Sequence, residues 1–218
     1  MKFATVLTLF FAAAAQADKD YFFRYKGGND ILDHQRLRSN ISIQYASPGV
    51  TLPPYNPADH FLRLTTNATA CSPAAVLIRV PTNPHPPPVA GYYGLSDREG
   101  VPDAFRLIYS YRLDEEGPGF RYTGWKLQRP GRGDSGEPGT LLLRYPIAAA
   151  GEKGRKKGWK WIAVKERNGD YDKWVPWYVK PSRANAAKLA SWDYENVDLE
   201  LVEAKGPVDS NAPGGVRE

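Results

Sequence analysis

The hydrophobic positions along the chain recur mainly with a period of two, the spacing that places alternate residues of a β-strand on one face. In the clearest runs, 41–45, 105–113 and 197–201, every second residue is apolar. Gly, Pro, Asn and Asp separate these runs, as they do in turns. The same pattern predicts further strands at 21–25, 61–65, 76–80, 120–127 and 140–145.

Helical periodicity is nearly absent, and the one helix we predict spans 182–190, with Ser182 as a candidate N-cap. We therefore predict an all-β fold of about ten strands, either a single-domain β-sandwich or a barrel-like fold, with at most one short helix near 182–190. The expected organisation is a signal peptide over 1–17, one β-sandwich domain over 18–204 and a disordered tail over 205–218.

The best defined unit is a β-hairpin formed by 159–166 and 171–179 around Asn168-Gly169. Asn-Gly is the preferred pair of a type I′ turn, in which both central residues have positive φ. A turn centred on this pair places Trp161 opposite Pro176 and makes the proline strand a sheet edge, because proline cannot donate a ladder hydrogen bond. It also gathers four large aromatic residues on one face: Trp159, Trp161, Trp174 and Tyr178.

This aromatic face has two interpretations. Large rings usually form the core, since each buries about 150–250 Å². The opposite hairpin face is also mainly apolar, with Ile162, Val164, Val175 and Trp177. If that second face is the core, the four rings lie outside and form a stacking platform for a ligand such as a sugar.

A basic run precedes the hairpin and contains Arg155, Lys156 and Lys157. It is either a solvated loop or an anion contact for an acidic glycan, a phospholipid or a protein. The formal net charge of +5 is mild for 218 residues, so we predict no nucleic-acid partner.

The first residues predict export. Lys2 precedes the mostly apolar run 4–14, and Ala15-Gln16-Ala17 supplies the small residues that a signal peptidase requires, with cleavage expected after Ala17. The run is shorter than the roughly 20 residues that span a bilayer, and no second run of that length follows, so a secreted, extracellular protein without a membrane span is expected.

Two sequons fit this compartment and make Asn40 and Asn67 candidate glycosylation sites. Cys71 is the single cysteine, so no intramolecular disulfide can form. We expect this thiol to be a small buried apolar residue.

Catalytic signals are weak. The loop 133–138 is similar to the nucleophile loop of chymotrypsin-like serine proteases, with Ser135 as nucleophile, but Glu137 replaces a glycine of that motif. His34 and His60 lack the surroundings of the protease histidine. The three histidines are far apart in sequence, so we predict no metal site and no cofactor.

The two ends of the chain carry a family resemblance. The Ala-rich leader, the start Tyr21–Tyr25, the closing strand 197–201 and Trp192-Asp193-Tyr194 before it resemble small secreted proteins of filamentous fungi whose function is unknown. The resemblance implies a secreted protein directed at a host or a cell wall.

The leading functional hypothesis is a secreted, non-catalytic protein that binds a glycan or a protein at an extracellular surface. The alternative is a secreted hydrolase that uses a glycosidase-like carboxylate pair or Ser135. A third hypothesis is an effector that acts on a host protein. The platform and the basic run are the candidate binding residues for the first.

Overall fold

The computed structural model describes residues 19–40, 46–53, 59–66, 75–79, 91–113, 119–130, 139–146 and 158–205. Several sequence-based predictions lie outside these residues: the signal peptide, the strand at 41–45, Asn67, Cys71, Ser135, the basic run Arg155–Lys157 and the tail from 206.

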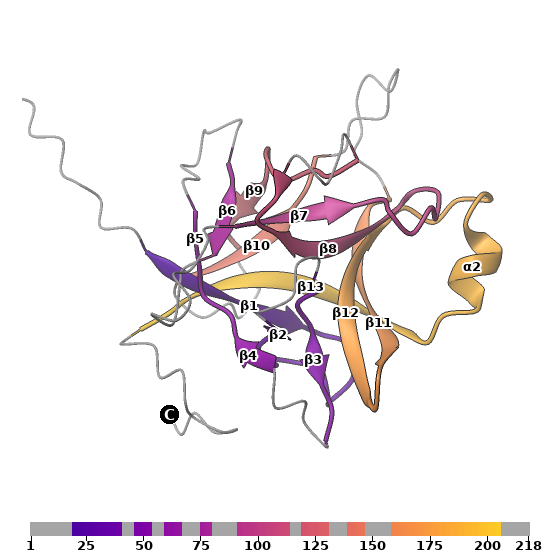
Figure 1. Ribbon diagram of the computed structural model, residues 1–218, viewed down its shortest axis with the longest axis horizontal. Helices are drawn as coiled ribbons and strands as arrows, with labels where there is room; N and C mark the ends of the chain where they lie inside the picture. The colour runs from indigo at the N-terminus through magenta and orange to yellow at the C-terminus, as the bar shows by residue number, and fades with distance from the viewer. Residues whose placement is uncertain are drawn as a thin grey trace, which may run out of the picture.

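The described residues form thirteen strands and one helix (Figure 1). In chain order these are β1 (Asp20–Lys26), β2 (Arg38–Asn40), β3 (Val50–Thr51), β4 (Asp59–Phe61), β5 (Leu64–Thr66), β6 (Leu77–Arg79), β7 (Tyr92–Ser96), β8 (Ala104–Ser110), β9 (Lys126–Gln128), β10 (Thr140–Arg144), β11 (Lys160–Asn168), β12 (Tyr171–Val179), α2 (Ala186–Ala190) and β13 (Tyr194–Glu203).

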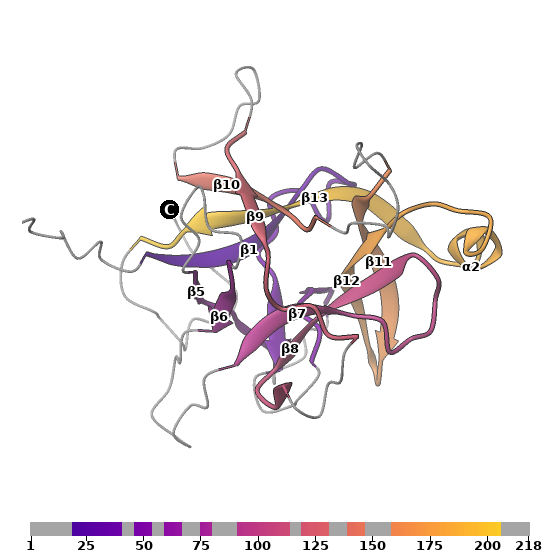
Figure 2. The ribbon, with the colours of Figure 1, turned by 90° about the horizontal axis from the view of Figure 1, so that it is seen from above.

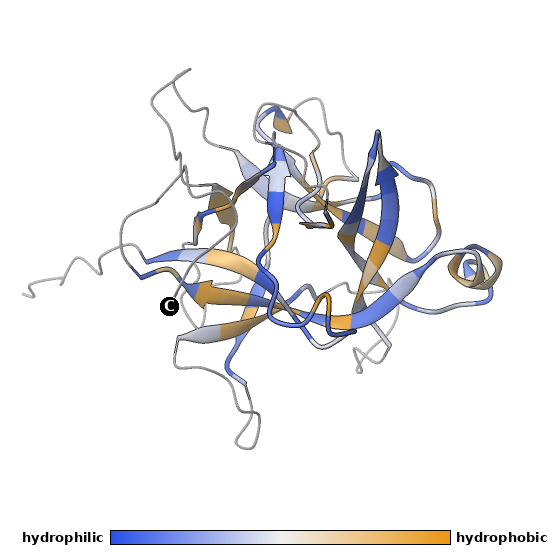
Figure 3. Ribbon diagram, turned by 90° about the horizontal axis from the view of Figure 1, so that it is seen from below, coloured by the Kyte–Doolittle hydropathy of each residue, from blue (hydrophilic) through white to orange (hydrophobic). Residues whose placement is uncertain are grey.

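Eight of these strands close into an antiparallel barrel, which confirms the predicted all-β, barrel-like fold. The order around the barrel is β1-β5-β6-β7-β8-β12-β11-β13, and β13 returns to β1. Closure removes the open sheet edges that would otherwise pair with other chains. The strands surround a common interior when viewed along the barrel (Figures 2 and 3).

Additional segments extend the barrel wall. β10 pairs with β13, and β9 pairs with β10. The stretch from Ala46 to β3 inserts where β8 and β12 separate, because Tyr109 N–H donates to Ala46 O (3.0 Å) and β3 pairs with β12. β2 and β4 form a separate two-stranded sheet.

The predicted alternation of strand residues is confirmed in β8 and β13. Phe105, Leu107 and Tyr109 belong to the interior core, as do Leu199 and Leu201. Aromatic rings make up much of this core, and the largest fully buried side chains include Trp125, Trp161, Tyr25, Tyr93 and Phe23.

Two predicted strands are divided or shortened. The stretch 61–65 is split because β4 pairs with β2 whereas β5 pairs with β1 and β6. The stretch 120–127 contributes the short β9, preceded by isolated bridges at Arg121 and Thr123. In both places the chain changes its pairing partner within a stretch that the sequence pattern predicts as a single strand.

The hairpin forms, but its turn is one residue later than predicted. Gly169 and Asp170 are the central residues, Gly169 has φ 64°, and Asn168 pairs with Tyr171. A glycine in the first central position is the preference of a type II′ turn. Trp161 therefore faces Tyr178 and Ala163 faces Pro176. Each pairing moves by two residues, so the same residues share a face as in the predicted register.

The prediction of an edge strand at Pro176 is wrong. β12 pairs with β11 on one side, and on the other with β3 at Lys173–Trp174 and with β8 at Trp177–Val179. Pro176 lies in the interval where the partner changes from β3 to β8. A proline is tolerated in this central strand because no partner on that side pairs with it.

The outer face of the hairpin is covered by the segment that contains α2, at the side of the barrel (Figure 2). Ile162, Val164 and Trp177 pack there with Leu189. The helix is shorter than predicted, and its N-cap is Asn185 rather than Ser182. Among the described residues, no helix is long and apolar enough to cross a membrane.

Candidate binding site

The structure places the predicted aromatic platform inside the barrel. The exposed fractions are 0% for Trp161, 5% for Trp174 and 3% for Tyr178, and Trp159 is half-buried. The expectation of an exposed ring strip is therefore corrected: these residues are core. The physical reason is that β8 and β13 flank the hairpin and close it into the barrel wall, while the α2 segment covers its other face.

The hairpin rings contact one another and other core rings. Trp161 lies 4.9 Å from Tyr178 and stacks on Trp125 at 6.5 Å, and Trp159 stacks on Tyr178 at 5.4 Å between ring centroids. Trp161 Nε1 donates to Leu143 O at 2.8 Å. The faces of these rings and the indole donor are used within the protein, so their role is packing.

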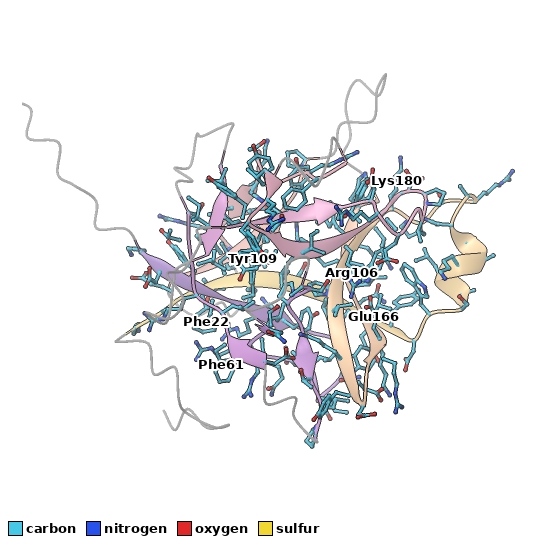
Figure 4. The ribbon with its side chains drawn as sticks, in the orientation of Figure 1. Phe22, Phe61, Arg106, Tyr109, Glu166 and Lys180 are labelled. Atoms are coloured by element: carbon cyan, nitrogen blue, oxygen red, sulfur yellow. The ribbon has the colours of Figure 1, made fainter. Side chains whose placement is uncertain are left out.

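A different cluster combines rings with positive charge near the barrel surface. It consists of Phe22, Arg36, Phe61 and Arg38, and we call it the arginine–phenylalanine stack. Phe22 belongs to β1, where its neighbour Phe23 is fully buried in the interior. Because side chains alternate along a strand, Phe22 points away from the interior. Figure 4 shows Phe22 and Phe61 on the same side of the molecule.

The stack has three close contacts between guanidiniums and rings. The Arg36 Cζ atom lies 3.8 Å from the Phe22 ring centroid and 4.8 Å from the Phe61 centroid. Arg38 Cζ lies 3.9 Å from the Phe61 centroid. The pairing of β2 with β4 brings Arg38 onto the Phe61 ring, because these two residues are direct partners across the two-stranded sheet. Each cation–π contact contributes roughly 0.5–1 kcal/mol when exposed and more when desolvated.

Arg36 differs from the neighbouring arginines in its partners. Arg24 donates to Glu200 at 2.8 Å and 3.0 Å, with both side chains buried, and Arg63 donates to Asp20 at 3.2 Å. No carboxylate among the described residues pairs with Arg36, and its buried Nε has no hydrogen-bond partner. Burial lowers the pKa of Arg36, and the charges of Arg63 and Arg38 lower that pKa further.

A second charged cluster lies on the outer side of the hairpin, near its turn. Lys173 Nζ is 3.0 Å from Asp59 Oδ2, which also accepts from Thr51 Oγ1 at 2.7 Å. Glu166 accepts from Arg106 and, at 2.9 Å, from Trp177 Nε1. Figure 4 shows Arg106 and Glu166 close together.

Burial perturbs the acid–base properties of this second cluster. It raises the pKa of Glu166 and lowers the pKa of Lys173, and the opposite charges of Arg106 and Asp59 counteract these two shifts. The Arg106–Glu166 pair links β8 to β11 across the intervening β12, and the Lys173–Asp59 pair links β12 to β4, which belongs to the two-stranded sheet. We therefore interpret the cluster as structural: Asp59 connects β3 and β4 to β12, and Arg106 connects β8 to β11.

The remaining predicted site residues are only partly covered. Asn40 ends β2 and is half-buried, and its glycosylation stays a prediction. Asn67, Ser135, Arg155, Lys156 and Lys157 lie outside the described residues. Within the described part of the chain, no group of three or more His, Cys, Asp or Glu residues could hold a metal ion.

The stack was not predicted from the sequence. A signal is present, because Arg36 and Arg38 alternate with the fully buried Leu37 and so project to the same side of an extended segment. Phe22 and Phe61 also fall in predicted strands. Their convergence depends on the β2–β4 pairing, which no local pattern indicates.

Comparison with known proteins gives no relative. No family model matches the chain, and neither a curated protein nor a solved structure matches it.

Proposed function

We propose that this protein is a non-catalytic binding protein that acts outside the cell, and that it binds an acidic glycan at the arginine–phenylalanine stack. One observation carries the proposal. The Arg36 guanidinium lies between the Phe22 and Phe61 rings without a carboxylate partner among the described residues.

The chemistry of the guanidinium favours an oxygen acid as the ligand. Its fork of N–H donors matches a carboxylate or a sulfate, and such charge-assisted bonds are about twice as strong as neutral ones. The rings on which Arg36 lies hold its plane in place, so less conformational entropy is lost on binding. A ligand anion would also offset the repulsion from Arg38 and Arg63, which lowers the Arg36 pKa.

A neutral sugar fits the stack less well than an acidic one. Guanidiniums already contact the Phe22 and Phe61 rings, which reduces the ring surface on which a pyranose could stack. The ligand is therefore selected by its charge. The predicted export favours an extracellular polyanion, and the basic run Arg155–Lys157 supplies a second candidate contact to a long chain.

The proposal is tested by binding to heparin oligosaccharides and to oligogalacturonate, with neutral dextran as the uncharged comparison. Oligogalacturonate carries carboxylates only, whereas heparin carries sulfates as well, so binding to heparin alone would indicate sulfate recognition. We expect binding to at least one acidic probe, no binding to dextran, and weaker binding as salt rises, because exposed charges are screened.

The test variant is Arg36→Gln, and the matched control is Arg129→Gln at an exposed arginine elsewhere on the barrel. Loss of a charged hydrogen bond costs about 1.5–3 kcal/mol, so Arg36→Gln should weaken binding about tenfold or more. Arg129→Gln should bind like the unaltered protein. Equal affinities for the two variants, or no binding to either acidic probe, would contradict the proposal.

A further inference from the structure

A pocket of about 270 Å³ lies between α2 and the outer face of the hairpin. Figure 1 shows α2 outside the ring of strands, next to β11 and β12. The pocket walls are mainly apolar, and Lys160 and Tyr194 add the polar groups. The lining includes Ile162, Val179, Leu189, Ala190, Lys160 and Tyr194.

The pocket exists because the α2 segment is fixed at both ends. At its start, Asn185 Nδ2 donates to Pro102 O at 2.8 Å and to Lys180 O at 3.1 Å. At its end, the Trp192 ring lies 4.7 Å from the Trp177 ring, and Lys165 N–H donates to Asp193 O at 2.8 Å.

Between these fixed ends, two of the three helix residues that line the pocket are small, and the third is Leu189. Ala186 and Ala190, four residues and one turn apart, contribute only methyl groups. The hairpin opposite contributes Ile162 and Val179, which are fully buried. The pocket opens to solvent, since Ala186 and Ala190 are exposed, and a mainly apolar cleft with a few polar groups is the usual form of a small-molecule site.

One positive charge lies at this apolar pocket. Lys160 Nζ donates to Asn196 Oδ1 at 2.5 Å and lies 6.0 Å from the Tyr194 ring centroid. No carboxylate among the described residues forms an ion pair with it. An ammonium beside an apolar pocket is complementary to a molecule with an apolar body and an acid group.

We infer that this pocket binds a small organic acid, with its apolar body against Leu189 and Ala190 and its carboxylate at Lys160. The pocket volume limits the size of the ligand's apolar part. An apolar cavity of about 150 Å³ takes benzene, so at the same ratio the pocket takes a body of about ten carbon atoms. This site is separate from the arginine–phenylalanine stack and does not depend on the function proposed for it.

Isothermal titration calorimetry of the full chain with decanoate and with decanol tests both the apolar contact and the recognition of the acid group. We expect decanoate to bind with one-to-one stoichiometry and decanol to bind more weakly. Lys160→Met should weaken decanoate binding about tenfold, the effect of losing one charge-assisted contact, and should leave decanol binding nearly unchanged. If Lys160→Met binds decanoate as tightly as the unaltered protein, the acid is not recognised and the inference is wrong.

Filling the pocket provides the second test, with a matched control on the same helix. Ala190→Leu places a larger side chain in the pocket and should abolish binding of both probes, whereas Ala187→Leu changes an exposed alanine outside the pocket lining. Ala186→Leu repeats the test from one turn earlier if Ala190→Leu does not fold. Binding by a pocket-filled variant equal to that of Ala187→Leu, or no decanoate binding by the unaltered protein, overturns the inference.

Discussion

The hairpin and the arginine–phenylalanine stack both gather aromatic rings, but they place the rings in opposite surroundings. In the hairpin, Trp161 and Tyr178 pack on other rings inside the closed barrel. In the stack, Phe22 and Phe61 are half-buried and pack on guanidiniums. An aromatic-rich segment thus forms core where the sheet closes around it, and surface where a ring projects away from the interior.

This difference separates stability from recognition. Rings that pack on rings exclude water and contribute mainly to folding. A guanidinium that packs on rings keeps its charge and its donors, and both remain able to interact with an anion. Substitutions should therefore act on stability in the hairpin and on binding in the stack.

The largest expected effect is from Trp161→Ala. This ring is fully buried and its indole donates to Leu143 O, so we expect a loss of about 5 kcal/mol in the free energy of unfolding, the upper end for such truncations. Phe61→Ala should cost only about 1–2 kcal/mol, because the ring is half-buried. Urea denaturation measures both, and equal losses would contradict the division between core and surface rings.

Arg24 and Arg36 face each other across a β-bridge, and we expect them to differ in their contribution to the free energy of unfolding. Arg24→Met leaves Glu200 charged and buried without its main partner, which should cost about 3–4 kcal/mol. Arg36→Met removes two cation–π contacts but no carboxylate contact, and it should cost only about 1–2 kcal/mol. A large destabilisation by Arg36→Met would mean that this arginine has a structural role.

A smaller effect is expected from overfilling the hairpin core. Ala163 is fully buried among the interior rings, so Ala163→Leu should destabilise the fold by about 2 kcal/mol. The same substitution at exposed Ala187 should change stability by less than about 0.5 kcal/mol. If Ala163→Leu were neutral in thermal or urea denaturation, the barrel interior would be less closely packed than the structure indicates.

The smallest effect concerns the pH dependence of stability. Burial raises the pKa of Glu166 above its usual 4.5, so the folded protein holds this proton at pH values where the unfolded chain has released it. Stability should therefore fall as pH rises from about 4.5 through the raised pKa of the folded state. Glu166→Gln should show a smaller fall over this window, and denaturation profiles that coincide for the two proteins would contradict the assignment.

The fold class was predictable because strand alternation is a local property. The inward faces of β8 and β13 follow from every second residue in 105–109 and 197–201. The hairpin was also predictable, and its turn was misplaced by one residue because Asn168-Gly169 and Gly169-Asp170 both fit a two-residue turn. Alternation does not indicate which of the two apolar hairpin faces points inward. That choice depends on how the barrel closes.

The candidate site was less predictable because it depends on contacts between distant segments. Phe22, Arg36 and Phe61 come from three segments that meet only through the β1 and β2–β4 pairings. The pocket beside α2 depends on where Asn185 and Trp192 attach the segment. Neither kind of contact leaves a periodic signal in the sequence.

The central claim is that the aromatic hairpin is core and that an acidic ligand binds at the stack. A titration of isotope-labelled protein with a heparin oligosaccharide, followed by backbone amide NMR shifts, tests it at every residue at once. We predict the largest shifts around Phe22, Arg36 and Phe61, with small shifts at Trp161 and Tyr178. Shifts concentrated on the hairpin, or no shifts at the stack, would contradict the claim.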